Sequence, residues 1–372
     1  MHVGVPKEIK DQEYRVSMTP GGVRELVSRN HTVWVEQDAG SEVGFTNDQY
    51  LAVGAKVVPT ADEVYEKAEL IVKVKEPQPD EFSKIRRDHI LFTYLHLAAE
   101  PSLTDHLLST GCSAIAYETV TEIYGGLPLL APMSEVAGRL SVQAGAHCLE
   151  KKQGGRGVLL GGVAGAPPAN VVILGGGMVG TQALTMAVGL GANVTVVDKS
   201  LRRLRELDAL FGGRLTTLYP SEEALEEQLI KADLVIGAIL IPGAATKKIV
   251  SREMLKMMKA GSVVVDIAID QGGCFESSRP TTHTQPTFID EGVVHFCVTN
   301  LPSSVPRTST IALNNATMPY IYALTEKGFQ QACLDDPHLL NGLNVYQGQV
   351  THEAVAQALN KVYQPAKNAI AN

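Results

Sequence analysis

Residues 171–180, VVILGGGMVG, restrict the fold of this chain more than any other stretch. A run of valine, isoleucine and leucine predicts a buried strand, and the glycines after it match G-x-G-x-x-G at Gly175, Gly177 and Gly180. In a strand–turn–helix unit these glycines allow a tight turn, a close approach of a pyrophosphate and close packing of helix on strand. The stretch therefore predicts a dinucleotide site at a helix N-terminus, whose free N–H groups favour phosphate.

An acidic residue follows this fingerprint at a distance typical of dinucleotide domains. The next predicted strand, NVTVVD, ends at Asp198, 23 residues after Gly175. A carboxylate there can accept hydrogen bonds from both ribose hydroxyls of NAD and would repel the 2′-phosphate of NADP. The strand, the glycines and the acid together predict an NAD site. A βαβ turn that binds no ligand is the alternative interpretation.

The composition restricts the possible partners. The 372 residues are enough for two or three domains, with 45% hydrophobic and 19% charged residues, as in an ordinary globular protein. A net charge of −8 argues against a nucleic-acid-binding surface. No run of about eighteen apolar residues occurs, and the segment MHVGVPKEIK lacks the apolar core of a signal peptide. We expect a cytoplasmic protein with no nucleic-acid partner and no membrane contact.

The cysteines do not indicate a structural crosslink. They are odd in number, scattered, and form no C-x-x-C pair: Cys112, Cys148, Cys274, Cys297 and Cys333. This pattern favours reduced thiols over a disulfide framework or a zinc site. Cysteines within apolar patterns are expected to be buried. We predict no metal site.

Strand and helix patterns alternate on both sides of the fingerprint, which predicts parallel sheets built from βαβ units. Residues 1–130 form one such α/β domain. Residues 131–306 contain six further strand patterns, which match a doubly wound dinucleotide domain. The tail, residues 307–372, is too short for a domain of its own and is expected to complete the first domain as the substrate-binding, catalytic part.

Two long helix patterns stand near the domain boundaries. One covers residues 134–152, with Ser134 as its N-cap, and the other covers residues 309–331. The predicted fold is therefore α/β, with two doubly wound, Rossmann-like lobes, a cleft between them and two long helices that bridge the lobes.

Five polar residues stand at or near the ends of predicted strands, where ligands of open α/β sheets bind. They are Arg15 in KEIKDQEYRV, Lys75 in LIVKVKEP, His96 in ILFTYLHLA, Asp270 after SVVVDIA, and Asn300 in HFCVTN. Each has another interpretation. Arg15 and Lys75 could be surface charges, and His96 could be a core histidine. Asp270 could be a turn former and Asn300 a strand-end cap.

Spacing does not distinguish Lys73 from Lys75. Side chains alternate with period two along a strand, so both lysines are predicted on one face. Either could be a solvated charge at a sheet edge, and the choice between them stays open on these grounds.

Several long segments of the chain resemble the alanine dehydrogenase family. In order, they are VGVPKEIKDQEYRVSMTP, VKVKEP, LFTYLHLA, PMSEVAGRLSVQAGA, the glycine fingerprint, VVVDIAIDQGGC and NLPSSVPRTST. The resemblance extends from the first strand to the last helix. It implies an NAD-dependent amino acid dehydrogenase that converts L-alanine reversibly to pyruvate and ammonium, and it implies a homohexamer.

The resemblance also implies roles for individual residues. Lys75 and His96 would carry the chemistry, Arg15 and Lys75 would bind the substrate, and Asp270 would complete the catalytic site. The implied contacts to NAD are Ser134, Gly175, Gly177, Met178, Val179, Gly180, Asp198, Arg203, Ile239, Leu240, Ile267, Asp270, Arg279, Val298, Asn300 and Leu301.

Two regions depart from the family pattern. Pro220 precedes Ser221 where relatives often have serine, so whether this loop contacts NAD stays open. Ala323 and Lys327 stand where some relatives have an acidic residue and a histidine for a metal ion, which agrees with the prediction of no metal site.

Two other functions remain possible from the sequence. The chain could be the nucleotide-binding part of a proton-translocating transhydrogenase, which exchanges hydride with NADPH on a partner and has no amino acid site. It could also be an NAD-responsive regulatory protein that binds ligands without reaction. Intact motifs around Lys75 and His96, and no predicted membrane span, argue against the transhydrogenase.

Overall fold

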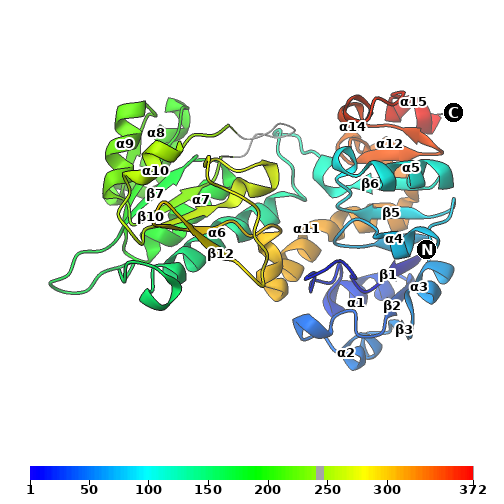
Figure 1. Cartoon of the computed structure of the whole chain (residues 1–372). Coiled ribbons are helices and arrows are strands. Elements are labelled where there is room, and N and C mark those ends of the chain that lie inside the picture. The colour runs from blue at the N-terminus through cyan, green and yellow to red at the C-terminus, as the bar shows by residue number, and fades with distance from the viewer. Residues whose placement is uncertain (240–246, 372) are drawn as a thin grey trace. The chain divides into compact units, whose positions relative to one another are not determined.

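The computed structural model describes residues 1–239 and 247–371; Leu240, one of the implied NAD contacts, lies outside the described residues. The chain divides into two compact units, unit 1 (Met1–Met133 and Val305–Asn372) and unit 2 (Ser134–Ser304). Each unit is built on a mostly parallel sheet covered by helices (Figure 1). The C-terminal segment therefore belongs to the same unit as the N-terminus.

Within the described residues, unit 1 contains an eight-stranded sheet in the order β15-β14-β6-β5-β4-β1-β2-β3. Strands β1 to β6 are parallel, whereas β14 is antiparallel to β6 and to β15. From β3 to β6 the order is 3-2-1-4-5-6, which is that of a doubly wound dinucleotide fold. The strands are β1 (His2–Val5), β2 (Thr32–Glu36), β3 (Lys56–Val58), β4 (Leu70–Val72), β5 (Ile90–Thr93), β6 (Ser113–Ala116), β14 (Leu343–Tyr346) and β15 (Gln349–Val350).

The core of unit 1 lies on both faces of its sheet. In β4, Leu70 and Val72 pack in one hydrophobic cluster, while Ile71 between them packs in the other. This division follows from the period-two alternation of side chains along a strand, and it explains why β4 is apolar throughout. The long helix α11 (Pro306–Lys327) covers the face of Leu70 with Leu313, Met318, Ile321 and Leu324.

The other helices of unit 1 are short. They are α1 (Pro20–Ser28), α2 (Asn47–Ala52), α3 (Ala61–Lys67), α4 (Pro79–Phe82), α5 (Pro101–Thr110), α12 (Phe329–Asp335), α13 (Pro337–Leu340), α14 (Glu353–Ala358) and α15 (Ala366–Ala371). Three 3-10 turns join them: η1 (Ser41–Val43), η2 (Leu97–Ala99) and η3 (Tyr117–Thr119).

Unit 2 contains a seven-stranded sheet in the order β12-β13-β11-β10-β7-β8-β9, counted over the described residues. All pairs are parallel except β12 with β13. The strands are β7 (Asn170–Leu174), β8 (Asn193–Val197), β9 (Leu215–Leu218), β10 (Leu234–Gly237), β11 (Val263–Asp266), β12 (Thr287–Asp290) and β13 (Val293–Phe296). The parallel strands again follow the order 3-2-1-4-5-6 of the dinucleotide fold.

The helices of unit 2 pack on both faces of this sheet, against two separate hydrophobic clusters. They are α6 (Ala131–Cys148), α7 (Met178–Gly189), α8 (Leu201–Phe211), α9 (Glu222–Lys231) and α10 (Arg252–Lys256). The 3-10 turns are η4 (Lys151–Gln153), η5 (Gly212–Arg214), η6 (Ile267–Gln271) and η7 (Leu301–Ser304). No helix in the described part of the chain is long and apolar enough to cross a membrane.

Two predicted element boundaries are wrong, and one strand was not predicted. Ser134 is not the N-cap of α6, because this helix already begins at Ala131 and takes Pro132 into its first turn, where proline's missing N–H costs nothing. The helix predicted at residues 309–331 ends at Lys327, and α12 starts separately after Gly328. The edge strand β12 was not predicted, because its pairing with β13 rather than an apolar pattern defines it.

Candidate functional site

The predicted polar residues of unit 1 follow three parallel strands at the carboxyl edge of the sheet. Arg15 lies in the loop after β1, Lys75 after β4 and His96 after β5. Strands β1 and β4 are neighbours at the point where the strand order reverses, which is where open α/β sheets bind ligands. Lys75 and His96 lie beyond the strand ends at Val72 and Thr93, so both belong to loops and not to the strands themselves.

The guanidinium of Arg15 is buried, with 2% of the side chain exposed, and it is held by Glu13. Arg15 Nε and Nη2 each donate to one carboxylate oxygen of Glu13 at 2.6 Å, and Arg15 Nη1 lies 3.0 Å from Met133 Sδ. Burial lowers the pKa of Arg15, but the bonds and charge of Glu13 outweigh burial and raise it overall. The two-point geometry therefore orients the guanidinium before any substrate binds.

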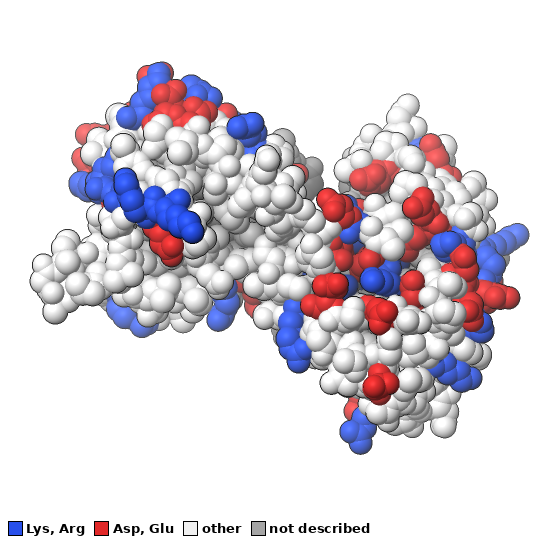
Figure 2. Space-filling model, turned by 60° about the horizontal axis from the view of Figure 1, so that its bottom comes forward, with Lys and Arg blue, Asp and Glu red and all other residues white. Residues whose placement is uncertain are grey.

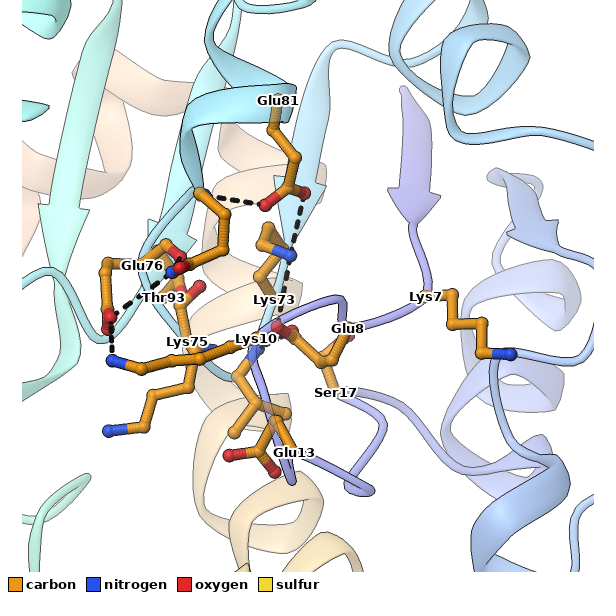
Figure 3. A network of polar contacts seen from close by, with 12 residues as sticks. Lys7, Glu8, Lys10, Glu13, Ser17, Lys73, Lys75, Glu76, Glu81 and Thr93 are labelled. Atoms are coloured by element: carbon orange, nitrogen blue, oxygen red, sulfur yellow. Dashed lines mark hydrogen bonds and ion pairs between the residues drawn. The ribbon is translucent and has the colours of Figure 1, made fainter. Parts of the chain in front are cut away.

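Lys73 is the centre of a buried ion-pair network (Figure 3). Its Nζ lies 3.1 Å from Glu8 Oε2 and 2.9 Å from Glu81 Oε1, and 1% of its side chain is exposed. The hydroxyl of Tyr65 donates to Glu81 at 3.0 Å. Burial lowers the pKa of Lys73, yet the two carboxylates reverse the effect and raise it. Burial raises the pKa of Glu8 to about 7, although Lys73 opposes this.

Lys75 differs from Lys73 in all these respects. Its side chain is only partly buried and points away from the ion pairs of Lys73, as Figure 3 shows. Its backbone is fixed on both sides: the N–H lies 3.4 Å from Glu8 Oε1, and the carbonyl accepts the Thr93 hydroxyl at 2.9 Å. Burial lowers the pKa of Lys75, and the positive charge of Arg15 lowers it further. The structure thus separates two lysines that the sequence could not distinguish.

His96 has a left-handed backbone, with φ 51° and ψ 35°, and caps η2. Its side chain is 43% exposed, and its ring stacks on Tyr94 with centroids 5.9 Å apart. Glu118, after β6, accepts the backbone N–H of His96 at 2.6 Å and has Oε1 3.8 Å from His96 Nδ1. The imidazole is therefore exposed at the edge of the sheet, where it can exchange a proton with a bound molecule or water.

Acidic and basic side chains stand side by side on the face of unit 1 that Figure 2 shows. Such mixing differs from the basic stripe that nucleic-acid-binding surfaces require. The local charges of the site therefore matter more than a uniform surface field.

In unit 2, the glycine fingerprint forms the turn between β7 and α7. Gly175 has φ 99°, a left-handed value that favours glycine, and Gly177 is the N-cap of α7. A Cβ at Gly180 would overlap the carbonyl oxygen of Gly175, whereas a Cβ at Gly177 would meet no atom of the described residues within 4 Å. The turn therefore combines close helix–strand packing with open space at the helix N-terminus, which fits a dinucleotide phosphate.

Asp198 follows β8 and ties its loop to the fingerprint. Asp198 Oδ2 accepts the N–H of Gly176, and Oδ1 accepts the N–H of Ser200, both at 2.8 Å. Each carboxylate oxygen has a further lone pair, so ribose hydroxyls can also donate to it. Arg203 donates to the Gly176 carbonyl at 2.7 Å and pairs with Glu206 at 2.8 Å, which compensates its charge beside Asp198.

Asp270 is exposed in η6, the turn after β11. The preceding Asp266 is buried, and its carboxylate accepts the N–H of Cys274 at 2.9 Å and the hydroxyl of Ser278 at 2.6 Å. Burial raises the pKa of Asp266, while these donors lower it. Asp266 thus fastens the loop that presents Asp270, a role that the sequence analysis missed.

The other residues that the resemblance assigns to NAD lie mostly in loops at the same carboxyl edge. They are Met178 and Val179 in α7, Ile239 after β10, Ile267 in η6, Val298 and Asn300 after β13, and Leu301 in η7. Ser134 lies inside α6. The guanidinium of Arg279 stacks on Phe288, 4.3 Å from the ring centroid.

The sequence analysis also missed the acidic residues that support the predicted ones, namely Glu8, Glu13 and Glu118. Glu8 and Glu13 both precede the predicted Arg15 in KEIKDQEYRV, and that clustering of opposite charges was the available signal. In residues 1–239 and 247–371, no group of three or more His, Cys, Asp or Glu side chains could hold a metal ion. All five cysteines are buried free thiols.

Two family models together match most of the chain. "Alanine dehydrogenase/PNT, N-terminal domain" matches residues 4–137, and "Alanine dehydrogenase/PNT, C-terminal domain" matches residues 141–353. These matches place both candidate groups, at Arg15 and at the glycine fingerprint, within regions similar to that family.

Individual relatives extend the similarity to the whole length. The chain is 55% identical over 370 residues to the alanine dehydrogenase of Halomonas elongata, with 100% of both covered. It is 52% identical over 371 residues to that of Bacillus subtilis, covering 100% of this chain and 98% of the relative.

Solved structures agree with these relatives. An L-alanine dehydrogenase superposes with a TM-score of 0.95 at 51% identity, over 97% of this chain and 99% of that one. A transhydrogenase from Sinorhizobium meliloti superposes with a TM-score of 0.81 at 24% identity, over 95% of this chain and 100% of that one. The second likeness concerns the fold alone.

We predict that the two lysines differ in their contribution to stability. Lys73→Ala leaves Glu8 and Glu81 buried without a counter-charge, which should lower the free energy of unfolding by about 3–5 kcal/mol. Lys75→Ala should change it by less than about 1 kcal/mol, because the Lys75 side chain is partly exposed. Urea denaturation followed by circular dichroism checks both values. Equal losses from the two variants would contradict this assignment.

We predict that Asp198 determines the choice of dinucleotide. Asp198→Ser removes the charge that repels a 2′-phosphate and an acceptor that orders the glycine turn. It should weaken NADH binding about tenfold or more and raise the ratio of NADPH to NADH affinity. Fluorescence titration with both dinucleotides measures this, with Asp208→Ser on the exposed side of α8 as the matched control. An unchanged ratio would refute the role.

Proposed function

This chain belongs to the alanine dehydrogenase/PNT family, and we propose that it catalyses the reversible, NAD-dependent oxidative deamination of L-alanine to pyruvate and ammonium. The observation that carries the proposal is full-length identity of 52–55% to curated alanine dehydrogenases. The cations at the carboxyl edge of unit 1 supply the chemistry that an amino acid substrate needs. The transhydrogenase likeness, at 24% identity, supports the fold and no activity.

Arg15 and Lys75 are proposed to bind the substrate. Glu13 takes the N–H of Nε and one N–H of Nη2, so the substrate carboxylate is expected at the end of the guanidinium formed by Nη1 and Nη2, where Nη1 contacts the weakly accepting Met133 sulfur. The contacts of Glu13 thus leave part of the Arg15 guanidinium, and not all of it, for the substrate. Lys75, with its lowered pKa, is placed to donate to the carbonyl oxygen of pyruvate.

The reaction separates into an oxidation and a hydrolysis. The Cα–H bond of alanine breaks with both electrons, leaving an iminium group, and NAD supplies the hydride acceptor when bound. Water then adds to the iminium carbon, and the carbinolamine expels ammonia to leave pyruvate. One proton is released per turnover besides the ammonium formed, so a group that exchanges protons near neutrality is needed.

His96 is proposed to be that acid–base group. Its imidazole is exposed at the edge of the sheet and stacked on Tyr94, so it can exchange protons with substrate or water. Asp270 is proposed to accept from the amino group or from the attacking water, since its carboxylate is exposed in η6. Both carry the roles that the family resemblance implies for them.

NAD is proposed to bind along the carboxyl edge of the unit 2 sheet. Gly175, Gly177 and Gly180 would receive the pyrophosphate and Asp198 the ribose, and Arg203 would hold the glycine turn. The remaining proposed contacts are Ser134, Met178, Val179, Ile239, Ile267, Asp270, Arg279, Val298, Asn300 and Leu301. The geometry of these loops fits NAD better than NADP because of the Asp198 carboxylate.

We also propose an assembly and a location for the protein. The family resemblance supports a homohexamer, which light scattering coupled to gel filtration measures directly. Five buried free thiols are compatible with a reducing compartment such as the cytoplasm.

The decisive experiment is an assay of the purified chain. NADH formation from L-alanine at alkaline pH, and NADH consumption with pyruvate and ammonium, should both be observed by absorbance. Glycine and L-serine in place of L-alanine, and NADP in place of NAD, define the specificity. Hydride exchange between NADH and NADPH without alanine oxidation would indicate a transhydrogenase instead, and binding without turnover would indicate a regulatory protein.

We predict a large kinetic effect of Arg15→Lys. A lysine retains the charge but cannot bind Glu13 at two points while presenting a further N–H group to the substrate. Misplacement of a substrate by about 1 Å can cost roughly 10²-fold in rate, so kcat/KM should fall by about that factor for both alanine and pyruvate. Steady-state kinetics in both directions measures this.

The affinity for NADH should be nearly unchanged in Arg15→Lys, since the dinucleotide residues belong to unit 2. Arg24→Lys, on the exposed side of α1, is the matched control and should behave as wild type. Wild-type kinetics for Arg15→Lys would show that Arg15 has no part in substrate binding.

A further inference from the structure

One carboxylate holds the backbone of the loop that carries His96. Glu118 lies in η3, directly after β6, the parallel neighbour of β5. Its Oε1 accepts the N–H of His96 at 2.6 Å, and the N–H of Leu95 lies 3.2 Å from Oε1 and 3.3 Å from Oε2. Two consecutive N–H groups of this loop are therefore fixed by a single side chain.

The backbone of His96 depends on such support. Its φ of 51° and ψ of 35° lie in the left-handed region, which histidine adopts only where its surroundings determine the conformation. Tyr94 adds a second restraint, because its ring is parallel to the imidazole within 4°. The conformation turns the imidazole to an exposed position while the main chain stays attached to the sheet edge.

The same carboxylate also stands beside the imidazole ring. Glu118 Oε1 lies 3.8 Å from Nδ1 of His96, so a protonated His96 forms an ion pair there. A carboxylate next to Nδ1 stabilises the imidazolium and leaves Nε2 to face a reactant. One acidic side chain thus acts on both the position and the charge of His96.

In the described part of the chain, further titratable groups stand near this loop, and one of them, His352, has a buried Nδ1 without a hydrogen-bond partner. Helix α14, which packs on η2, brings His352 and Glu353, and burial lowers the pKa of His352 although Glu118 raises it. Helix α5, which also packs on η2, brings Asp105, paired with Lys361 at 2.5 Å, and His106, bonded to the Phe82 carbonyl at 2.7 Å. Glu100, which ends η2, and Tyr94 complete the set.

We propose that Glu118 is the positioning residue of His96: it fixes the histidine backbone through two N–H groups and stabilises the protonated imidazole during proton transfer. Glu118 acts through His96 and not on the substrate itself. The inference rests on the proposed alanine dehydrogenase activity, and it adds a residue that neither the sequence pattern nor the family resemblance singled out.

Glu118→Gln tests the charge of this residue. Glutamine retains the shape and one acceptor oxygen but removes the negative charge, so a protonated His96 loses its ion-pair partner. If neutral His96 acts as the base, the pH at which kcat/KM for L-alanine falls on the acidic side should shift to lower values by about half to one pH unit. A shift of this size is expected for charges about 4 Å apart near solvent. A merely structural role would reduce stability without moving this limb.

Glu118→Ala tests the backbone contacts. Loss of both acceptors at Leu95 and His96 should lower kcat by about tenfold or more beyond the effect of Glu118→Gln, because the imidazole is no longer held in place. NADH affinity should not change. Glu150→Gln is the matched control, since Glu150 lies 3.3 Å from the exposed His147 and forms a similar pair in unit 2. It should leave both the pH profile and kcat unchanged.

The outcomes separate this inference from the proposed function. Wild-type protein that does not oxidise L-alanine refutes the proposed function and gives no pH profile to compare. With active wild type, a Glu118→Gln variant whose acidic limb coincides with that of wild type overturns the role of Glu118. If Glu118→Gln does not fold, Glu118→Asp is measured instead. The shorter side chain of aspartate should lower kcat by at least about fivefold while the affinity for NADH stays unchanged. A wild-type kcat for Glu118→Asp would overturn the inference.

Discussion

The arrangement of unit 1 depends on charges that are buried in pairs. Arg15 with Glu13, and Lys73 with Glu8 and Glu81, are almost fully removed from solvent beneath the carboxyl edge of the sheet. Buried charges are tolerated only with close partners, because desolvation of an unpaired ion costs several kcal/mol. The pairs therefore hold the loops after β1 and β4 in one arrangement, and in that arrangement the proposed reactive cation is Lys75 and not Lys73. Lys73 is neutralised from two sides, whereas Lys75 extends from the same loop with a lowered pKa.

The two units share a strand order but solve different binding problems. Unit 2 offers backbone groups at the turn of Gly175 and Gly177, where the absence of side chains leaves room for the phosphate of the proposed dinucleotide. Unit 1 has side-chain cations at the corresponding edge, with Arg15 already oriented by Glu13. A small amino acid has little surface to bury, so its recognition must come from such charged groups. One topology thus supports a backbone site and a side-chain site.

Acidic residues behind the reactive ones are a common feature of the structure. Glu13 orients Arg15, Glu8 bonds to the backbone at Lys75, and Asp266 holds the loop of Asp270. Each of these carboxylates is buried and accepts from N–H, hydroxyl or cationic donors, which lie in the same loop for Glu13 and in a distant segment for Glu8. A rigid supporting layer of this kind keeps loop residues in a fixed place despite their position outside the strands.

The sequence alone determined the α/β class, the parallel sheets and the NAD fingerprint, because these follow from local patterns: strand alternation, glycines at fixed spacing and Asp198 after the next strand. Local patterns could not assign Lys73 and Lys75, since both fit the same spacing and only the distant Glu8 and Glu81 distinguish them. The occupied fork of Arg15 was likewise invisible, because a side-chain pair forms only once the loop has its fold. Tertiary structure decides these questions because burial and the direction of each side chain depend on how the loops fold onto the sheet, whether the charge partner is near in the chain, as Glu13 is to Arg15, or distant, as Glu8 is to Lys73.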